Sequence, residues 1–377
     1  MRTSTMNRAF FVALAALLGA CGDDSSSTST TTTTGAQPTP PAQEAPRPLR
    51  EVVGNLFEAI APAQVNRDKM LLGRRLFHDT RLSGDETISC ATCHSLSTGG
   101  AEPRPTSVGI RGQVGPINAP TVLNATFNFA QFWDGRAANL LEQAAGPVTN
   151  PIEMGGDWAQ ILPRLQADAD YQRDFTAVYG ENGITQENVL DAIVEYERYL
   201  VTPSRFDRWL GGDDSALTEE EQRGLRLFVE TGCTTCHRGR NVGGDSYQKM
   251  GLVHDYFAQR GGRITEADLG RFNVTQNEED RHKFKVPTLR NVALTAPYFH
   301  DGSERELAGA VRTMAYVQLG RELADADVNA IVAFLNSLTG EIPADAHMPG
   351  AQGAPAPQGE GQQGEGQQGE GASATAQ

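Results

Sequence analysis

The stretch Cys90-Ala91-Thr92-Cys93-His94, CATCH, recurs later in the chain as CTTCH at residues 233–237. Two thiols three residues apart lie on one helical turn, where each can form a thioether to a haem vinyl group, while the following histidine can reach the iron. The two copies use four of the five cysteines in the sequence. The sequence therefore predicts two covalent c-type haems, attached at Cys90, Cys93, Cys233 and Cys236 and ligated by His94 and His237.

Two other readings of the cysteine pairs stay open from the pairs alone: a zinc site with four cysteine ligands, or two redox disulfides. Histidine makes up only 7 of the 377 residues, so its place directly after both pairs argues for haem. The start of the chain also carries an export pattern, and c-type haem is attached to exported proteins.

Residues 1–21 have the composition of a secretory signal, with a positive beginning at Arg2 and Arg8 and an apolar run over 9–20 that is too short to span a bilayer. The run ends in Leu-Gly-Ala-Cys, which resembles the bacterial lipobox; the alternative is an ordinary cleavage site. We expect Cys21 to be lipidated and to anchor a periplasmic protein to the membrane. Gly22 in the next position favours the outer membrane.

Both ends of the chain lack the apolar residues that a core needs. Residues 22–48 are mostly Ser, Thr, Ala and Pro, which predicts a disordered tether, and residues 343–377 repeat Gly, Gln and Glu and predict a disordered tail. The formal net charge is −15 and only four lysines are present. This balance argues against a nucleic-acid partner and suits a basic protein partner, although a solvated acidic surface gives the same number.

Apolar residues recur at helical spacing in both halves, for example over 188–200 and 325–338, whereas strand-like alternation is scarce. The fold class is therefore mainly α, with two cytochrome c-like domains that each carry one haem. Proline and paired glycine interrupt the pattern between residues 202 and 212. We place the N-terminal haem domain at 49–205 and the C-terminal haem domain at 206–342.

Four longer segments resemble the bacterial dihaem cytochrome c peroxidases, in the same order along the chain. The resemblance extends from about Leu72 to Gly340. The segments are LFHDTRLSGDETISCATCH at 76–94, NAPTVLNATFNFAQFWDGRAANLLEQAAGPVTNPIEMG at 118–155, FKVPTLRNVALTAPYFHDGS at 284–303 and VRTMAYVQLG at 311–320.

The resemblance implies different roles for the two haems. The N-terminal haem would react with hydrogen peroxide, beside a polar pair formed by Glu153 and Gln143. A carboxylate held over the iron can take a proton from the near oxygen of peroxide and return it to the leaving one. The C-terminal haem would accept electrons from a small cytochrome c or a cupredoxin, with Met314 as its second ligand, since a thioether raises the potential. Trp133 would lie between the haems and assist electron transfer.

The same resemblance implies a calcium ion held by Asn118 and by the backbone carbonyls of Thr295 and Pro297, and it implies a homodimer. Oxygen ligands of this kind suit a hard cation. Without the resemblance, Glu153 is typical of a surface acid after a proline turn, while Met314 and Trp133 are typical of core residues.

One position departs from the family pattern. Most members carry a histidine in the loop after the first haem motif, where it caps the N-terminal iron; here that loop reads PTSVGIRGQ at 105–113, with Ile110 in the matching place. Isoleucine cannot ligate iron. No histidine lies between His94 and His237, which leaves Met154 and Tyr171 as alternative ligands. We expect an uncapped haem that binds peroxide in the oxidised enzyme.

The sequence thus predicts an exported, lipid-anchored dihaem peroxidase. A second hypothesis is a dihaem oxidase that uses peroxide to modify a partner protein. Related enzymes with that activity carry a tyrosine in place of Met314, which argues against it, whereas Ile110 leaves it open. A third hypothesis is a plain electron carrier, which would need no Glu153.

Overall fold

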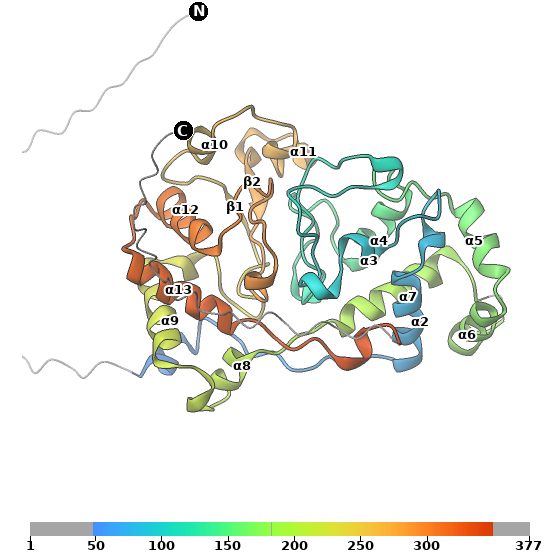
Figure 1. The fold of residues 1–377 in the computed structure, drawn as a ribbon, viewed down its shortest axis with the longest axis horizontal. Coiled ribbons are helices and arrows are strands. Elements are labelled where there is room, and N and C mark those ends of the chain that lie inside the picture. Colours follow the sequence, from blue (N-terminus) through green and yellow to red (C-terminus); the bar gives the residue numbers. More distant parts are fainter. Residues whose placement is uncertain (1–47, 182, 350–377) are drawn as a thin grey trace, which may run out of the picture. The chain divides into compact units, whose positions relative to one another are not determined.

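The computed structural model describes residues 48–181 and 183–349 (Figure 1). The predicted signal peptide, the lipidated Cys21, nearly all of the tether and most of the tail lie outside this range. None of the helices in the described part is both long and apolar enough to cross a membrane.

The fold is mainly α-helical, as the sequence predicts. Helices of the first half carry the first haem motif and surround it (Figure 1). They are α2 (Arg67–Phe77), α3 (Cys90–Cys93), α4 (Leu140–Thr149), α5 (Trp158–Gln166), α6 (Ala169–Tyr179) and α7 (Gln186–Tyr199). The first helix of the described chain, α1 (Leu49–Val53), packs on the second half instead.

The second half is also helical and contains one small antiparallel sheet, in which Tyr247 lies opposite Lys285 and Lys249 opposite Lys283. The second haem motif begins in the 3-10 helix Cys233–Thr235. The other elements are α8 (Arg205–Leu210), α9 (Glu219–Thr231), β1 (Tyr247–Lys249), α10 (Tyr256–Arg260), α11 (Phe272–Thr275), β2 (Lys283–Lys285), α12 (Leu307–Leu319) and α13 (Asp325–Ser337).

Each half is built on one pair of helices, α2 with α7 and α9 with α13. A glycine lies at each crossing. A Cβ on Gly73 would lie 1.8 Å from the carbonyl oxygen of Ala192, and a Cβ on Gly224 would lie 1.8 Å from that of Ala330. The helices can approach this closely only because both positions lack a side chain.

A second repeat has one copy in each half, PTVLN at 120–124 and PTLRN at 287–291. Each ends in an asparagine with positive φ, Asn124 at 59° and Asn291 at 61°, a conformation that asparagine adopts more readily than most residues. Both side-chain amides donate to the buried hydroxyl of Thr202 at 2.8 Å. The two haem-binding halves are therefore joined by one buried polar network.

The two ends of the described chain pack on opposite halves. Leu49, Val53 and Phe57 belong to the hydrophobic core of the second half, while Ala346 belongs to that of the first. The ordered chain thus continues beyond the predicted start of the tail at 343, because the Tyr196 hydroxyl donates to the Ala346 carbonyl at 2.9 Å. The boundary between the halves at 205/206 stays a prediction.

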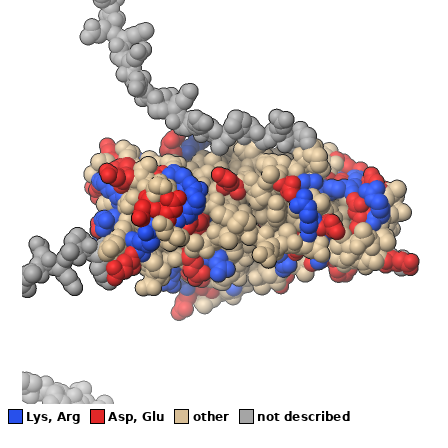
Figure 2. Space-filling view, turned by 90° about the horizontal axis from the view of Figure 1, so that it is seen from below, with Lys and Arg blue, Asp and Glu red and all other residues tan. Residues whose placement is uncertain are grey.

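Charged side chains of both signs are interleaved on the face drawn in Figure 2. Many arginines pair with a nearby carboxylate, as Arg81 does with Asp79 and Arg173 with Asp170. On this face the acidic side chains lie beside basic ones rather than in one acidic patch.

Candidate functional site

None of the four motif cysteines forms a disulfide within the described residues. Within the described ranges the only group of three or more metal-ligating side chains is Asp268, His300 and Asp301, so the cysteines do not form a zinc site with four ligands. Burial raises the pKa of Cys90 and of Cys233 to about 12. A neutral thioether suits these surroundings better than a metal-bound thiolate.

The two motif histidines are held in the same way. Nδ1 of His94 lies 3.1 Å from the carbonyl oxygen of Gly100, and Nδ1 of His237 lies 3.4 Å from that of Val242. Burial lowers the pKa of His94 and lowers that of His237 to about 4. Both imidazoles are therefore neutral, with Nε2 left to ligate iron, as expected of a ligand whose other nitrogen donates to a carbonyl.

A large, mainly apolar cavity adjoins the second motif, and its lining includes Cys233, Cys236, His237 and Met314. Met314 lies on α12 and packs partly buried against the apolar cluster of Met250, Phe257 and Phe284. The structure thus brings the predicted methionine ligand to the same cavity as the predicted histidine ligand. Cysteine, histidine and methionine on one apolar cavity fit a covalently attached haem.

Trp133 and the predicted calcium ligands Asn118, Thr295 and Pro297 also line this cavity. The indole Nε1 of Trp133 donates to the Asn118 carbonyl at 2.9 Å. The Asn118 side-chain amide donates to the carbonyl of Arg104 at 3.0 Å. Trp133 is therefore fixed to the backbone of a residue at the predicted cation site. Calcium binding itself stays a prediction.

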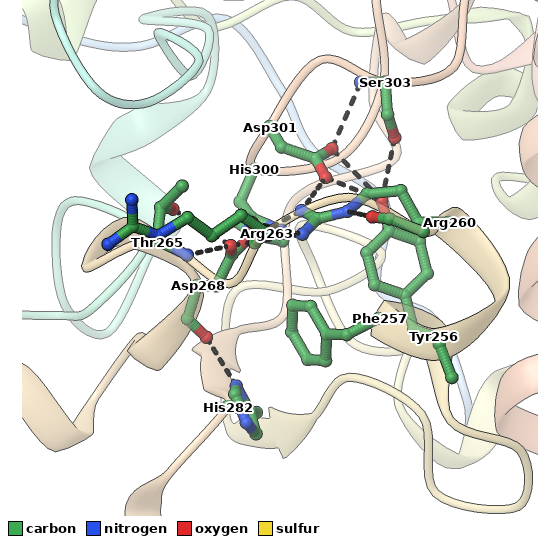
Figure 3. Close-up of polar contacts among 12 residues, drawn as sticks. Tyr256, Phe257, Arg260, Arg263, Thr265, Asp268, His282, His300, Asp301 and Ser303 are labelled. Carbon is green, nitrogen blue, oxygen red and sulfur yellow. Dashed lines mark hydrogen bonds and ion pairs between the residues drawn. The ribbon is translucent and has the colours of Figure 1, made fainter.

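An ion-pair network includes His300 (Figure 3). His300, which lines the cavity, faces Oδ1 of Asp268 at 2.8 Å through Nε2. Arg260 pairs with Asp268 at 2.8 Å and with Asp301 at 2.7 Å. Because Arg260 neutralises both carboxylates, the three potential metal ligands act as an ion-pair network that orients the His300 ring.

On the side of the first haem motif, Glu153 is half-buried and accepts a hydrogen bond from Nδ2 of Asn150 at 2.8 Å. Burial raises its pKa above the usual range, while Arg136 and the Asn150 hydrogen bond act in the opposite direction. A carboxyl group with a raised pKa holds a proton more readily than an exposed glutamate, which suits a group that must accept and return one.

A second cavity is lined by Glu153, Asn150, Arg136 and Phe132, together with residues of α4. The Arg136 guanidinium stacks 3.5 Å above the Phe132 ring. From α4, Glu142 lines this cavity but Gln143 does not. The predicted pairing of Gln143 with Glu153 therefore stays a prediction.

The loop around Ile110 is attached to the Glu153 segment. The amide of Ile110, which is buried, donates to the Glu153 carbonyl at 2.8 Å. Nε2 of Gln113 donates to the Pro151 carbonyl at 2.9 Å. A Cβ on Gly155 would lie 2.3 Å from Cδ1 of Ile110, so the isoleucine packs tightly there.

The two alternative ligands are both buried in the first core. Met154 is 4% exposed and Tyr171 is 1% exposed. The Tyr171 hydroxyl donates to Oδ2 of Asp79 at 2.7 Å, and the guanidinium of Arg75 lies 4.3 Å from its ring centroid. Tyr171 is therefore already engaged by partners within the core.

The chain matches two protein families, the di-haem cytochrome c peroxidases over residues 67–215 and cytochrome c over residues 221–339. It is 48% identical over 288 residues to a cytochrome c551 peroxidase of Nitrosomonas europaea, covering 76% of this chain and 84% of that protein. The chain belongs to the dihaem cytochrome c peroxidase family. Members of this family are oxidoreductases with two c-type haems, which confirms the haem prediction.

Two further relatives of this dihaem peroxidase extend the comparison. It is 53% identical over 274 residues to a cytochrome c peroxidase of Escherichia coli, covering 72% of this chain and 58% of that longer protein. A crystal structure of a MauG-like protein associated with microbial copper homeostasis has a TM-score of 0.67 and 30% identity, covering 78% of this chain and 96% of that one.

Sequence reasoning did not identify four residues that the structure places near the haem motifs of this dihaem peroxidase. Arg136 could have been noticed, because it follows Trp133 by three residues in a motif that the family resemblance had already singled out. Asn150 and Lys285 also lie in segments quoted for the resemblance, at 118–155 and 284–303. Glu197 lies outside these segments, and a charge in a helix is ordinary on a surface.

Proposed function

We propose that this protein reduces hydrogen peroxide to two waters at the His94 haem, using two protons and two electrons that enter through the His237 haem. The observation that carries the proposal is Glu153, a half-buried carboxyl group with a raised pKa, held by Asn150 and bordering a cavity. An electron carrier would have no use for such a group.

The haem, when bound, supplies the iron that takes up peroxide and the electrons that break its O–O bond. Glu153 moves the protons: it accepts one from the near oxygen and returns it to the far oxygen, so that water can leave. Asn150 holds the carboxylate in one orientation through its hydrogen bond of 2.8 Å. Gln143 would hold the peroxide from the same side.

The proposed peroxide-binding face is open in the oxidised state, because Ile110 stands where a histidine would cap the iron. The hydrogen bonds from Ile110 and Gln113 to the segment 151–153 support this proposal, since they hold the loop in place. The engagement of Tyr171 by Asp79 supports it as well.

Electrons would enter at the haem ligated by His237 and Met314 and would pass Trp133, whose indole is fixed by the Asn118 carbonyl. The donor is a small cytochrome c or a copper protein. Calcium held by Asn118, Thr295 and Pro297 would hold in place the backbone to which Trp133 is hydrogen-bonded. We also propose a periplasmic, lipid-anchored homodimer, with the anchor at Cys21 and the outer membrane as its site.

The test is an electron paramagnetic resonance spectrum of the oxidised protein, followed by peroxide turnover with reduced cytochrome c and no prior reduction of the enzyme. A high-spin ferric signal with immediate turnover is the expected result. Two low-spin signals, with activity only after partial reduction, would show that a ligand caps the first haem.

The second candidate function is an oxidase that uses peroxide to modify side chains of a partner protein. The observation that favours it is the uncapped position at Ile110, together with the MauG-like fold relative. Peroxide consumption that depends on a protein substrate, and is not sustained by reduced cytochrome c, would support this second function over the first.

A further inference from the structure

The cavity at the second haem motif contains one fixed charge. Among the described residues that line it, Lys285 is the only lysine, arginine, aspartate or glutamate. The rest of the lining is apolar, aromatic or neutral polar. A haem that enters such a cavity brings two propionate groups, and no other side chain in the lining carries a full positive charge to meet them.

Lys285 is the last residue of β2 and is only 4% exposed. Its amide donates to the Trp133 carbonyl at 2.8 Å. Lys283, two residues earlier, pairs with Asp280 at 3.1 Å, whereas no carboxylate within the described ranges pairs with Lys285. Burial alone lowers the pKa of Lys285 to about 8.

His300, the other basic residue of the lining outside the haem motif, already has a partner. Asp268 lies 2.8 Å from its Nε2, and burial lowers its pKa so that the ring is neutral (Figure 3). A neutral histidine that faces a carboxylate cannot serve as the cation for a propionate.

An ammonium group that is buried without a counter-ion is costly, and proteins rarely keep one unless it meets an anion. We infer that Lys285 binds a propionate of the haem attached at Cys233 and Cys236. The ion pair keeps that propionate ionised and keeps the lysine protonated. This inference requires the second haem, which family membership establishes, and it does not depend on the peroxidase reaction.

The contact has two consequences for the second haem. A positive charge near the iron favours the reduced state, so it raises the reduction potential of a haem that must accept electrons. The contact also links the propionate to Trp133, because the Lys285 amide bonds the tryptophan carbonyl. Lys285 is thus a positioning residue for electron entry.

The experiment compares Lys285→Met and Lys285→Arg in the fully matured protein with both haems. The potential of the second haem is measured by spectroelectrochemistry from pH 6 to pH 9. In Lys285→Met the potential is expected to fall, and it should become pH-dependent, because the unpaired buried propionate now takes up a proton on reduction. Lys285→Arg should retain the potential and the weak pH dependence of the unsubstituted protein.

Lys249→Met is the matched control, because Lys249 is an exposed lysine of the neighbouring strand β1 and its loss changes the net charge equally. It should leave both measurements unchanged. The inference is wrong if Lys285→Met behaves like the unsubstituted protein, or if Lys249→Met produces the same shift. Where Lys285→Met fails to retain haem, a crystal structure of the unsubstituted holoprotein decides: Nζ of Lys285 beyond hydrogen-bond distance of every propionate oxygen would overturn the contact.

Discussion

The two haem-binding halves share one frame. A Cβ on Gly73 would lie 3.1 Å from Cβ of Tyr196, and a Cβ on Gly224 would lie 3.0 Å from Cβ of Phe334. The two helix pairs therefore cross at equivalent residues, and α7 and α13 can be compared position by position.

The next residue along each last helix shows the difference. Glu197 is 4% exposed in the first half, and Leu335 is 3% exposed in the second, where it lines the haem cavity. Glu197 contributes to the raised pKa of Cys90, and one of its oxygens has no hydrogen-bond partner in the described protein. Burial raises the pKa of Glu197 to about 8.

The shared helix frame sets where each haem motif is held, while single residues set what surrounds it. The first half places carboxyl groups, Glu153 and Glu197, near its haem motif, where the proposed reaction needs protons. The second half lines the cavity at its motif with apolar side chains and Met314, and Lys285 is the only charged residue among the described residues of that lining. This contrast suits one site for proton-coupled chemistry and one for electron transfer.

The largest expected effect comes from removing the acid that distinguishes the first half. Glu153→Gln should lower peroxide turnover roughly 10²- to 10⁴-fold, because no carboxylate remains to move the proton. Steady-state assays with reduced cytochrome c measure the loss. Glu187→Gln, at an exposed glutamate of α7, is the control. Turnover should also rise with pH through the raised pKa of Glu153, since only the ionised form accepts a proton. A Glu153→Gln enzyme with full activity would contradict the assignment.

Alanine in place of the glycine at each helix crossing tests whether the two helix pairs pack in the same way. Gly73→Ala and Gly224→Ala each place a methyl group against a backbone carbonyl, and each should lower the free energy of unfolding by roughly 3 kcal/mol. Denaturant unfolding followed at each haem measures the loss. In Gly115→Ala the nearest atom is 3.5 Å away, so this control should be neutral. A loss in only one half would show that the crossings are not equivalent.

Glu197 occupies the position in α7 that Leu335 occupies in α13, and it should make the free energy of unfolding depend on pH. The folded protein keeps the Glu197 proton up to about pH 8, whereas the unfolded chain releases it near 4.5. The free energy of unfolding therefore falls as pH rises through this range. Glu197→Leu should gain roughly 4 kcal/mol more at pH 9 than at pH 5, measured by denaturant midpoints at both pH values. Leu335→Glu should show the reverse dependence, and two flat profiles would refute the burial argument.

The smallest effect is expected at Tyr171. Tyr171→Phe removes the hydrogen bond to Asp79 and should cost about 1 kcal/mol, measured by thermal or denaturant unfolding. Because the hydroxyl is engaged in the core, the oxidised spectrum of both haems should not change. A new high-spin signal in this variant would identify Tyr171 as the ligand that caps the first haem.

Local patterns predicted much of the molecule. The helical periodicity over 188–200 and 325–338 is confirmed by α7, Gln186–Tyr199, and by α13, Asp325–Ser337. The scarcity of strand patterns is confirmed as well, since both strands are three residues long. These features depend on contacts within a few residues, which a sequence displays directly.

Contacts between distant segments were not predictable in the same way. The packing of residues 49–57 on the second core depends on partners more than a hundred residues away. Glu197 and Lys285 were missed for a related reason. Their functional signal is burial, and a charged residue in a helix or strand shows that only once the neighbouring elements are in place.

Each end of the described chain packs in the core of the opposite half, and this affects when the two cores can form. The first core includes Ala346, and the second includes Leu49, Val53 and Phe57. A chain emerging from its N-terminus cannot complete the first core until its last ordered residues have been synthesised. Because Ala346 follows both CxxCH motifs in the sequence, its contact with the first core forms only after both motifs have been synthesised.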